Sequence, residues 1–173
     1  MSINLKNELF CIDSSTFIIM EKHYPPSLGN DLWIEFDTLF DQGNIISHSI
    51  VFDEITTNSK YADHLTKWIL PKRNYFKSFS KVQIQYVPQI IKKFPGLIDA
   101  NSEKDQADPW LIALAIEMDR EQTELFHKKQ IVYVVSEESK NSAVKIPAVS
   151  MYYGLKSLNL VELCQLFGGH FVF

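Results

Sequence analysis

LFCIDSSTFI, residues 9–18, decides the predicted fold, because a buried strand, an acid and a helix start follow one another in it. The apolar run 9–12 predicts a short strand. Asp13 and the two serines after it offer side-chain oxygens that cap a helix beginning near Thr16. An ionised carboxylate at the end of a buried strand is costly unless it is paired, hydrogen-bonded or bound to a metal. Asp13 is therefore the first candidate for a functional residue.

Strand signals recur along the rest of the chain. QIVYVV (130–135) is a continuous β-branched run, typical of a strand covered on both faces. NIISHS (44–49) predicts a brief strand, and IPAVSM (146–151) predicts the last one. Because these strands alternate with helical patterns, the sequence predicts an α/β fold with a mostly parallel central sheet.

Apolar residues at helical spacing fill the intervals between the predicted strands. In DPWLIALAIEM (108–118), Asp108 is at the N-cap position and Pro109 at the first helical position, where the missing N–H costs nothing. Pro88 lies inside an apolar stripe over 76–94 and is expected to kink or split that helix. The other predicted helices are one carrying Trp33, Phe36, Leu39 and Phe40 that Gly43 ends, one from Ser49 to about Asn58, an amphipathic piece with Tyr61, Leu65, Trp68 and Ile69 that Pro71 closes, and LVELCQLF (160–167).

The composition is that of an ordinary globular protein. The 173 residues predict a single domain over 1–173, and the net charge of −4 argues against a protein that coats nucleic acid through overall positive potential. Cys11 and Cys164 stand in apolar surroundings without the spacing of a zinc or redox site, so we expect buried thiols. The absence of a long apolar stretch predicts a cytoplasmic protein without membrane contact.

Acidic residues follow two of the predicted strands. In open α/β sheets, ligands bind beyond the carboxyl ends of the strands, where Asp13 and the acids of SEES (136–139) fall. If Asp13, Glu54, Asp108 and Glu138 meet there, their repulsion raises some pKa values strongly unless a divalent cation neutralises them. Because this donor set contains only oxygen, Mg²⁺ or Mn²⁺ is the preferred ion.

Each of these acids also has an ordinary structural interpretation. Asp13 and Asp108 are good N-caps for the helices that follow them. Glu54 could be a solvated helix residue, and Glu137 and Glu138 could be ordinary loop acids.

Four stretches, in order, resemble the acidic motifs of PIN-domain ribonucleases. The resemblance implies a Rossmann-like three-layer fold in which Asp13, Glu54, Asp108 and Glu138 hold one or two Mg²⁺ or Mn²⁺ ions. Ser15 and Ser136 are then hydrogen-bonding supports, and Glu137 is an alternate for Glu138. In the fourth motif Ser replaces the usual Thr and Glu replaces the usual Asp. The stretches are CIDSSTFI (11–18), VFDEI (51–55), ADPWLIALA (107–115) and VVSEE (134–138).

KIPAVSMYYGLKSLNLVELC (145–164) resembles the tail of a VapC-like toxin subgroup. The implied activity is metal-dependent hydrolysis of RNA, with DNA left open, by the toxin of a toxin–antitoxin pair. The implied partners are RNA, a cognate antitoxin and a second copy in a homodimer. Two aromatic-rich segments, 24–33 and 163–173, could serve such contacts, although core packing or a docked terminus explains them equally well.

Flanking cations are needed for RNA to approach an acidic site. Lys72, Arg73, Lys77 and Lys81 form one candidate RNA-binding patch, and the pairs 92–93 and 128–129 are others, unless all are scattered surface residues. Trp110 could stack on a base or pack in the core.

Two other functions remain open at this stage. A haloacid-dehalogenase-type phosphatase also has an acid at a strand end, but Ser15 stands where its second acid would be and Phe17 where its Thr or Val would be. A PIN-like module that has lost catalysis and serves binding or assembly is the other alternative.

Overall fold

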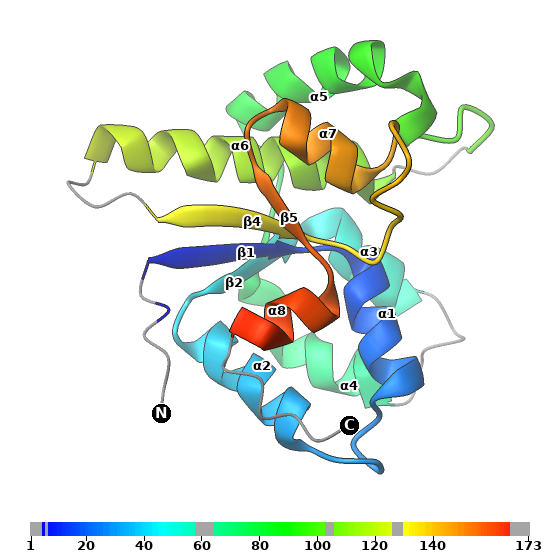
Figure 1. The fold of residues 1–173 in the computed structure, drawn as a ribbon, viewed down its shortest axis with the longest axis vertical. Helices are drawn as coiled ribbons and strands as arrows, with labels where there is room; N and C mark the ends of the chain where they lie inside the picture. Colours follow the sequence, from blue (N-terminus) through cyan, green and yellow to red (C-terminus); the bar gives the residue numbers. More distant parts are fainter. Residues whose placement is uncertain (1–4, 6, 58–63, 103–105, 126–129, 167–173) are drawn as a thin grey trace.

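A five-stranded, wholly parallel sheet forms the centre of the molecule. The computed structural model describes residues 5, 7–57, 64–102, 106–125 and 130–166. Helices cover both faces of the sheet, so the protein has a three-layer, Rossmann-like α/β fold, as predicted (Figure 1). The strands, in the spatial order β3-β2-β1-β4-β5, are β1 (Glu8–Ile12), β2 (Ile45–His48), β3 (Phe76–Lys77), β4 (Ile131–Val135) and β5 (Lys156–Leu158).

The two faces of the sheet support separate hydrophobic clusters. Successive side chains of a strand point to opposite faces, so Phe10 and Ile12 of β1 enter one cluster while Leu9 and Cys11 enter the other. The first cluster packs α1 (Ser14–His23), α2 (Asp31–Asp41), α3 (Ser49–Thr57), α4 (His64–Ile69) and α8 (Leu160–Leu166). The second packs α5 (Lys81–Lys93), α6 (Ala107–Leu125) and α7 (Ile146–Tyr152).

The strand order reverses at β1, which pairs with β2 on one side and β4 on the other. The chain runs outward from β1 to β2 and β3, then returns through α5 and α6 to β4. The Asp13 N–H donates to the carbonyl of Val135 at 2.9 Å, so the ends of β1 and β4 are tied together. A ligand site in this fold class lies beyond such a reversal, at the carboxyl ends of the strands.

Most predicted elements are confirmed. The strands expected at 9–12, 44–49 and 130–135 are β1, β2 and β4, and the helices carrying Trp33 and Leu163 are α2 and α8. The first helix begins at Ser14 rather than near Thr16, because Asp13 itself is its N-cap. Tyr61 and Asn58 lie outside the described residues.

The prediction of a last strand over 146–151 is wrong. These residues form α7, with Pro147 in its first turn, where the proline ring fixes a helical φ. Ile146, Pro147, Val149 and Ser150 are buried at helical spacing. The strand beside β4 is instead β5, further along the chain.

The prediction that the apolar stripe over 76–94 is helical is wrong at its beginning, and Pro88 does not split the helix. Phe76 and Lys77 form β3, and α5 begins only after Ser80, whose side chain accepts from the Gln83 N–H at 3.1 Å. Pro88 stands on the exposed side of α5, and the helix continues through it. Beyond Pro71 the chain continues as the 3₁₀ segment η2 (Leu70–Tyr75), and a second such segment, η3 (Pro95–Leu97), follows α5.

Cys11 and Cys164 are buried free thiols, as predicted. Among the helices of the described residues, none combines the length and apolar character needed to cross a membrane.

Candidate acidic active site

Asp13 forms the floor of the site at the end of β1, with 4% of its surface exposed. Its Oδ2 accepts from the Ser15 hydroxyl at 2.5 Å and from the Ser136 hydroxyl at 3.3 Å, so both predicted supports bind the same carboxylate. The Ser15 N–H donates to the same oxygen at 3.3 Å, which makes Asp13 the helix cap as well. Burial raises the pKa of Asp13, the Ser15 bonds oppose this, and Glu138 raises it further.

Glu54 connects the first and third motifs. Its Oε2 accepts from the Ser14 hydroxyl at 2.7 Å, and its Oε1 accepts from the Ala107 N–H at 3.3 Å. Ser14 and Ala107 are the chain neighbours of Asp13 and Asp108, so Glu54 lies between two other acids of the site. Burial raises the pKa of Glu54, the Ser14 bond opposes this, and Asp13 adds to the rise. Ser14 is predicted above only as a capping residue, and nothing in its sequence neighbourhood points to Glu54.

Asp108 is not the N-cap that the sequence predicts. Helix α6 begins at Ala107, so Asp108 lies inside the first turn. No donor among the described residues bonds its carboxylate. Burial raises the pKa of Asp108 to about 8, with further contributions from Asp13, Glu138 and Glu54 that Lys145 partly offsets.

Glu138 and Glu137 have different partners among the acids. Glu138 raises the pKa values of both Asp13 and Asp108. Burial raises the pKa of Glu137 and Asp13 adds to the rise, but its Oε1 accepts from the Leu160 N–H at 2.7 Å at the start of α8. The Glu137 N–H donates to the Ser15 hydroxyl at 3.1 Å, so its backbone still supports the site.

Lys145 is a cation in this otherwise acidic site and is not predicted from the sequence. Its Nζ lies 2.8 Å from Glu138 Oε1, and the pKa of Lys145 is raised by Glu138 first and also by Asp108 and Asp13. The Glu138 Oε2 accepts from the Ile146 N–H at 2.9 Å. The sequence signal that could have identified Lys145 is its place directly before Ile146 and Pro147. That signal can be used only once α7 is known to be a helix.

The fold thus brings together the four predicted acids from four separate segments. Within the part of the chain that the structure describes, no three His, Cys, Asp or Glu side chains form a group that could hold a metal ion as they stand. The carboxyls are close enough to shift one another's pKa values, yet Asp13, Glu54 and Glu138 are each turned toward hydrogen-bond donors of their own. Neither Asp108 oxygen accepts a hydrogen bond from the described residues, whereas the Asp13 carboxylate also bonds the Ser14 backbone. The Asp108 oxygens are therefore the best placed to bind a cation.

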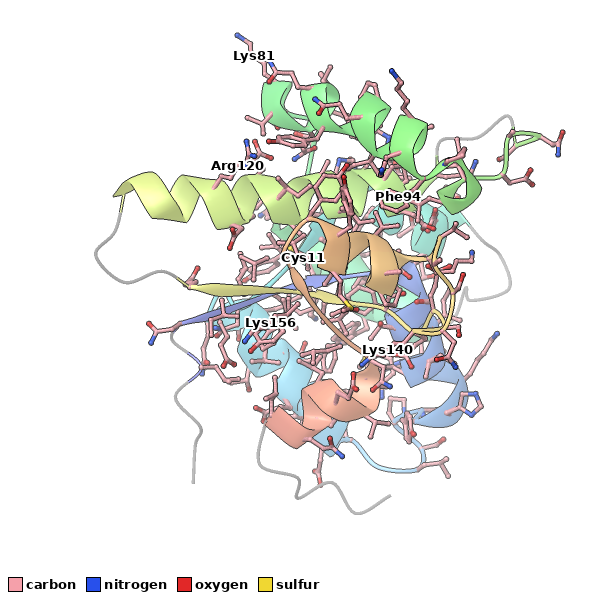
Figure 2. All side chains as sticks on the ribbon, turned by 45° about the horizontal axis from the view of Figure 1, so that its top comes forward. Cys11, Lys81, Phe94, Arg120, Lys140 and Lys156 are labelled. Carbon is pink, nitrogen blue, oxygen red and sulfur yellow. The ribbon has the colours of Figure 1, made fainter. Side chains whose placement is uncertain are left out.

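The four residues of the predicted basic patch differ in their contacts. Lys72 Nζ pairs with Asp37 at 2.7 Å and lies 4.2 Å from the centre of the Trp68 ring, and its side chain is only 15% exposed. Arg73 lies over the Phe52 ring at 4.6 Å. Lys77 and Lys81 are exposed, and Lys81 projects from the start of α5 in the outer layer (Figure 2). For all four residues an RNA contact stays a prediction.

Other predicted contact residues have packing roles or lie outside the described residues. Trp110 is half-buried and stacks on His48 with ring centres 5.6 Å apart, so its core interpretation is confirmed. In segment 24–33, Trp33 is buried and its indole N–H donates to the Tyr24 carbonyl at 2.7 Å, whereas Leu28 is exposed. Lys93 lies over the Tyr152 ring at 5.4 Å. The pair 128–129 and residues 167–173 are outside the described part of the chain.

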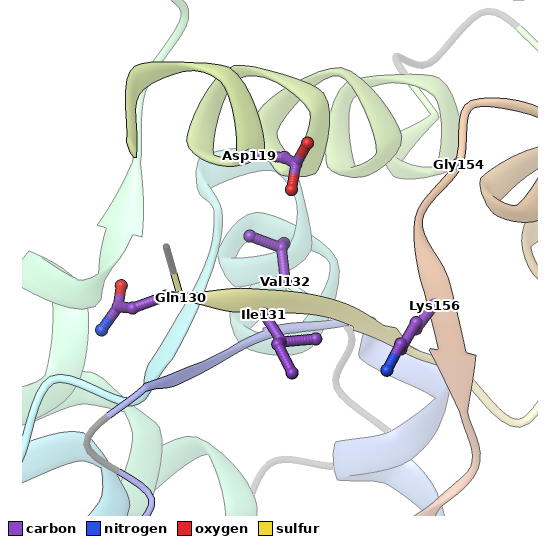
Figure 3. A pocket seen from close by; sticks show the side chains of 6 residues that line it. All are labelled: Asp119, Gln130, Ile131, Val132, Gly154 and Lys156. Atoms are coloured by element: carbon purple, nitrogen blue, oxygen red, sulfur yellow. The ribbon is translucent and has the colours of Figure 1, made fainter. Parts of the chain in front are cut away.

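A pocket of about 260 Å³ lies at the opposite ends of the strands (Figure 3). Its lining comes from the beginnings of β4 and β5 and from α6, far along each strand from the acids at the carboxyl ends. The lining residues are Asp119, Gln130, Ile131, Val132, Gly154 and Lys156. Because it contains none of the four clustered acids, this pocket is separate from the acidic site.

Comparison with known protein families gives one match that covers most of the chain. A family model described as a domain of unknown function (DUF4411) matches residues 10–168, which include all four acids and Lys145. No curated protein matches the chain.

Proposed function

The chain belongs to the DUF4411 family, and from its acidic site we propose that it is a metal-dependent nuclease of the PIN type, which hydrolyses phosphodiester bonds in RNA. The family description names no activity, so the proposal depends on the residues of the site. We propose RNA as the substrate because the four acidic motifs resemble those of PIN-domain ribonucleases.

The observation that carries the proposal is the bridging position of Glu54. One carboxylate bonds to Ser14 at 2.7 Å and to the Ala107 N–H at 3.3 Å, next to Asp13 and Asp108 respectively. Three acids remote in sequence therefore lie side by side, and Ser136 joins the Glu138 segment to Asp13. A structural protein gains no stability from gathering like charges in a half-buried position, because burial and repulsion both disfavour ionisation.

The donor set fits a hard divalent cation. Asp108 would hold it first, because its oxygens accept no bond from the described residues, and Asp13, Glu54 and Glu138 would complete the site. Carboxylate oxygens without His or Cys favour Mg²⁺ or Mn²⁺. When bound, such ions polarise the phosphate, lower the pKa of water and stabilise negative charge on the attacking and leaving oxygens.

The residues of the chain prepare the acids for this role. Ser15 and Ser136 fix the orientation of Asp13, and Ser14 with the Ala107 N–H fixes that of Glu54. The amino end of the 19-residue helix α6 favours negative charge on Asp108. The Glu138 side chain is 19% exposed and that of Lys145 is 42% exposed, so the substrate phosphate approaches from their side.

The test is cleavage of a mixed pool of structured and single-stranded RNA with Mg²⁺ or Mn²⁺, with the new ends mapped. Asp13→Asn and Asp108→Asn should each reduce cleavage at least 100-fold, as expected for residues that hold a catalytic ion. Asp53→Asn is the matched control, because Asp53 precedes Glu54 on α3 but is exposed. Cleavage that survives Asp13→Asn would contradict the proposal.

The same variants separate the alternatives. Release of phosphate from small esters through a covalent phosphate on Asp13 would favour a haloacid-dehalogenase-type phosphatase. Folded protein without Mn²⁺ binding or cleavage of RNA or DNA would favour an inactive binding module. The same assay with single-stranded DNA in place of RNA shows which nucleic acid the protein cleaves.

We also propose that this nuclease is the toxin of a toxin–antitoxin pair. Induced synthesis in a bacterial host should then arrest growth, whereas Asp108→Asn at equal abundance should not. An antitoxin would be a protein that forms a stoichiometric complex, prevents the arrest and blocks cleavage in vitro. The predicted homodimer is tested by the mass of the purified protein in solution.

A further inference from the structure

We propose that Lys145 is an exchangeable counter-ion of the acidic site, which competes with a divalent cation for Glu138. This inference rests on the proposed function and adds a residue that regulates occupancy of the same site. It also gives a reason why one cation lies among four acids.

The bonds of Glu138 differ from those of the other acids. Both of its oxygens have donors at the start of α7. Oε1 lies 2.8 Å from the Lys145 ammonium, and Oε2 accepts from the Ile146 N–H at 2.9 Å. Each Glu138 oxygen therefore already has a donor, and the donor at Oε1 carries a positive charge. A divalent cation at Oε1 competes with the Lys145 ammonium for that oxygen.

Lys145 is free to make that movement. Its side chain is 42% exposed, and its backbone is fixed as the residue before α7, so the flexible four-carbon stem can turn without disturbing the helix. The Ile146 N–H bond does not depend on the ammonium and can keep Glu138 near its position. The exchange therefore needs only a side-chain rotation.

The charges around Lys145 explain why a divalent cation would displace it. The ammonium interacts with Asp108 and Asp13 as well as with Glu138, so it lies within the field of the site rather than beside a single partner. A divalent cation has twice the charge and can contact Asp13 and Asp108 directly. Because the ammonium and the divalent cation compete for Glu138 Oε1, binding of one weakens binding of the other.

Lys140 offers a matched comparison from the same connection between β4 and α7. Its ammonium also pairs with a carboxylate, lying 2.5 Å from Glu162. Neither Lys140 nor Glu162 contributes to the pKa shift of Asp13 or Asp108. Figure 2 shows Lys140 close to α8. Removal of this charge leaves the acids of the site unchanged.

The experiment is titration calorimetry of Mn²⁺ into chelator-treated full-length protein. Lys145→Met should tighten Mn²⁺ binding by about tenfold, within the range of coupling expected between two ligands that compete for one carboxylate. Lys145→Arg keeps the charge and should stay within about threefold of the wild type. Lys140→Met should be unchanged, and a gain there equal to that of Lys145→Met would overturn the inference.

A double variant tests whether the competition acts through Glu138. In a Glu138→Gln background, Lys145→Met should change Mn²⁺ affinity by less than about threefold, since the contested carboxylate is gone. A tenfold effect in that background would mean that Lys145 acts only through its long-range field, and would overturn the inference.

The outcomes distinguish this inference from the proposed function. If the wild type binds Mn²⁺, Asp13→Asn abolishes binding and Lys145→Met has wild-type affinity, then the nuclease proposal stands and the role of Lys145 is wrong. If the wild type binds no Mn²⁺ at all, both are wrong. Circular dichroism of each variant establishes that it is folded before the affinities are compared.

Discussion

The acids of the site differ in how many hydrogen bonds stabilise their carboxylates. Asp13 receives bonds from two serine hydroxyls, and Glu54 from one hydroxyl and one backbone N–H. Asp108 receives none from the described residues, although it is surrounded by like charges. A folded protein keeps such an unfavourable residue at a functional site when function requires it.

Asp108→Asn should therefore stabilise the fold while it abolishes cleavage. Burial raises the pKa of Asp108 to about 8, so folding in chelator near neutral pH costs the protonation of this carboxyl, and Asn removes that cost. The melting temperature should rise by several degrees, about 1–2 kcal/mol. Saturating Mn²⁺ should raise the melting temperature of the wild type but not that of the variant, since only the former binds the ion. A variant that melts lower than the wild type in chelator would contradict this explanation.

Glu137 and Glu138 should differ sharply when each is changed to Gln. Glu138→Gln removes a charge from the acidic site, so we expect cleavage to fall at least tenfold with little change in stability. Glu137→Gln weakens the bond to the Leu160 N–H at the start of α8, so stability should fall by about 1 kcal/mol while cleavage remains. Urea unfolding and RNA cleavage measured on the same samples decide between them, and the reverse pattern would make Glu137 the fourth acid.

At the scale of elements, a buried polar chain fixes α5 and α6 against β2. The Ile50 N–H donates to His48 Nδ1, which assigns the ring proton to Nε2, and this nitrogen bonds Gln83 Oε1 at 3.2 Å. Gln83 Nε2 in turn donates to Glu117 at 2.7 Å. Because His48 and Gln83 are buried, these bonds determine the register of the helices as well as their contact.

The His48 ring should make stability depend on pH. Burial lowers the pKa of His48 to about 4 from its ordinary 6.5, while the Gln83 bond partly opposes this. Between these values the unfolded chain binds more protons, so the contribution of His48 is fully present above pH 6.5 and is lost as the pH falls toward 4. The whole effect is up to about 3 kcal/mol.

Urea unfolding of the wild type and His48→Gln from pH 7.5 to 4.5 measures this contribution. The other titrating groups are common to both proteins, so the difference between the two free energies of unfolding should shrink as the pH falls. Parallel curves would show that the ring remains accessible to protons in the folded state.

At the scale of the whole molecule, the sheet separates two hydrophobic layers that have to form together. Cys11 belongs to one layer and Cys164 to the other. Burial raises the pKa of the Cys11 thiol, and burial with Glu137 and Glu35 raises that of Cys164 to about 12. Both thiols are thus protonated and shielded in the folded protein.

Both cysteines should react with a thiol reagent only when the whole domain opens. We expect the two labelling rates to be equal at neutral pH and to rise together with urea, as global unfolding requires. Mass spectrometry of the labelled peptides distinguishes the sites. Faster labelling of Cys164 would show that α8 opens separately from the sheet.

The sequence was sufficient to predict an element wherever its local pattern favoured one type of secondary structure. The apolar runs at 9–12 and 130–135 favour strands covered on both faces, and the parallel α/β architecture was predicted from them. The pattern at 146–151 is apolar enough for either a strand or a helix, and the burial of Ile146, Pro147, Val149 and Ser150 at helical spacing shows that it is a helix. Phe76 likewise looked helical until its pairing with Ser47 in β2 was known.

The sequence by itself determined the fold class and which four acids are candidates, because strand periodicity and the types of side chain are properties of short segments. Only the tertiary structure decided that Glu54 bridges Ser14 and Ala107, that Glu137 bonds the start of α8, and that Lys145 pairs with Glu138. These contacts join residues as many as 53 positions apart. No local pattern specifies such distances, which are fixed by the packing of helices on both faces of the sheet.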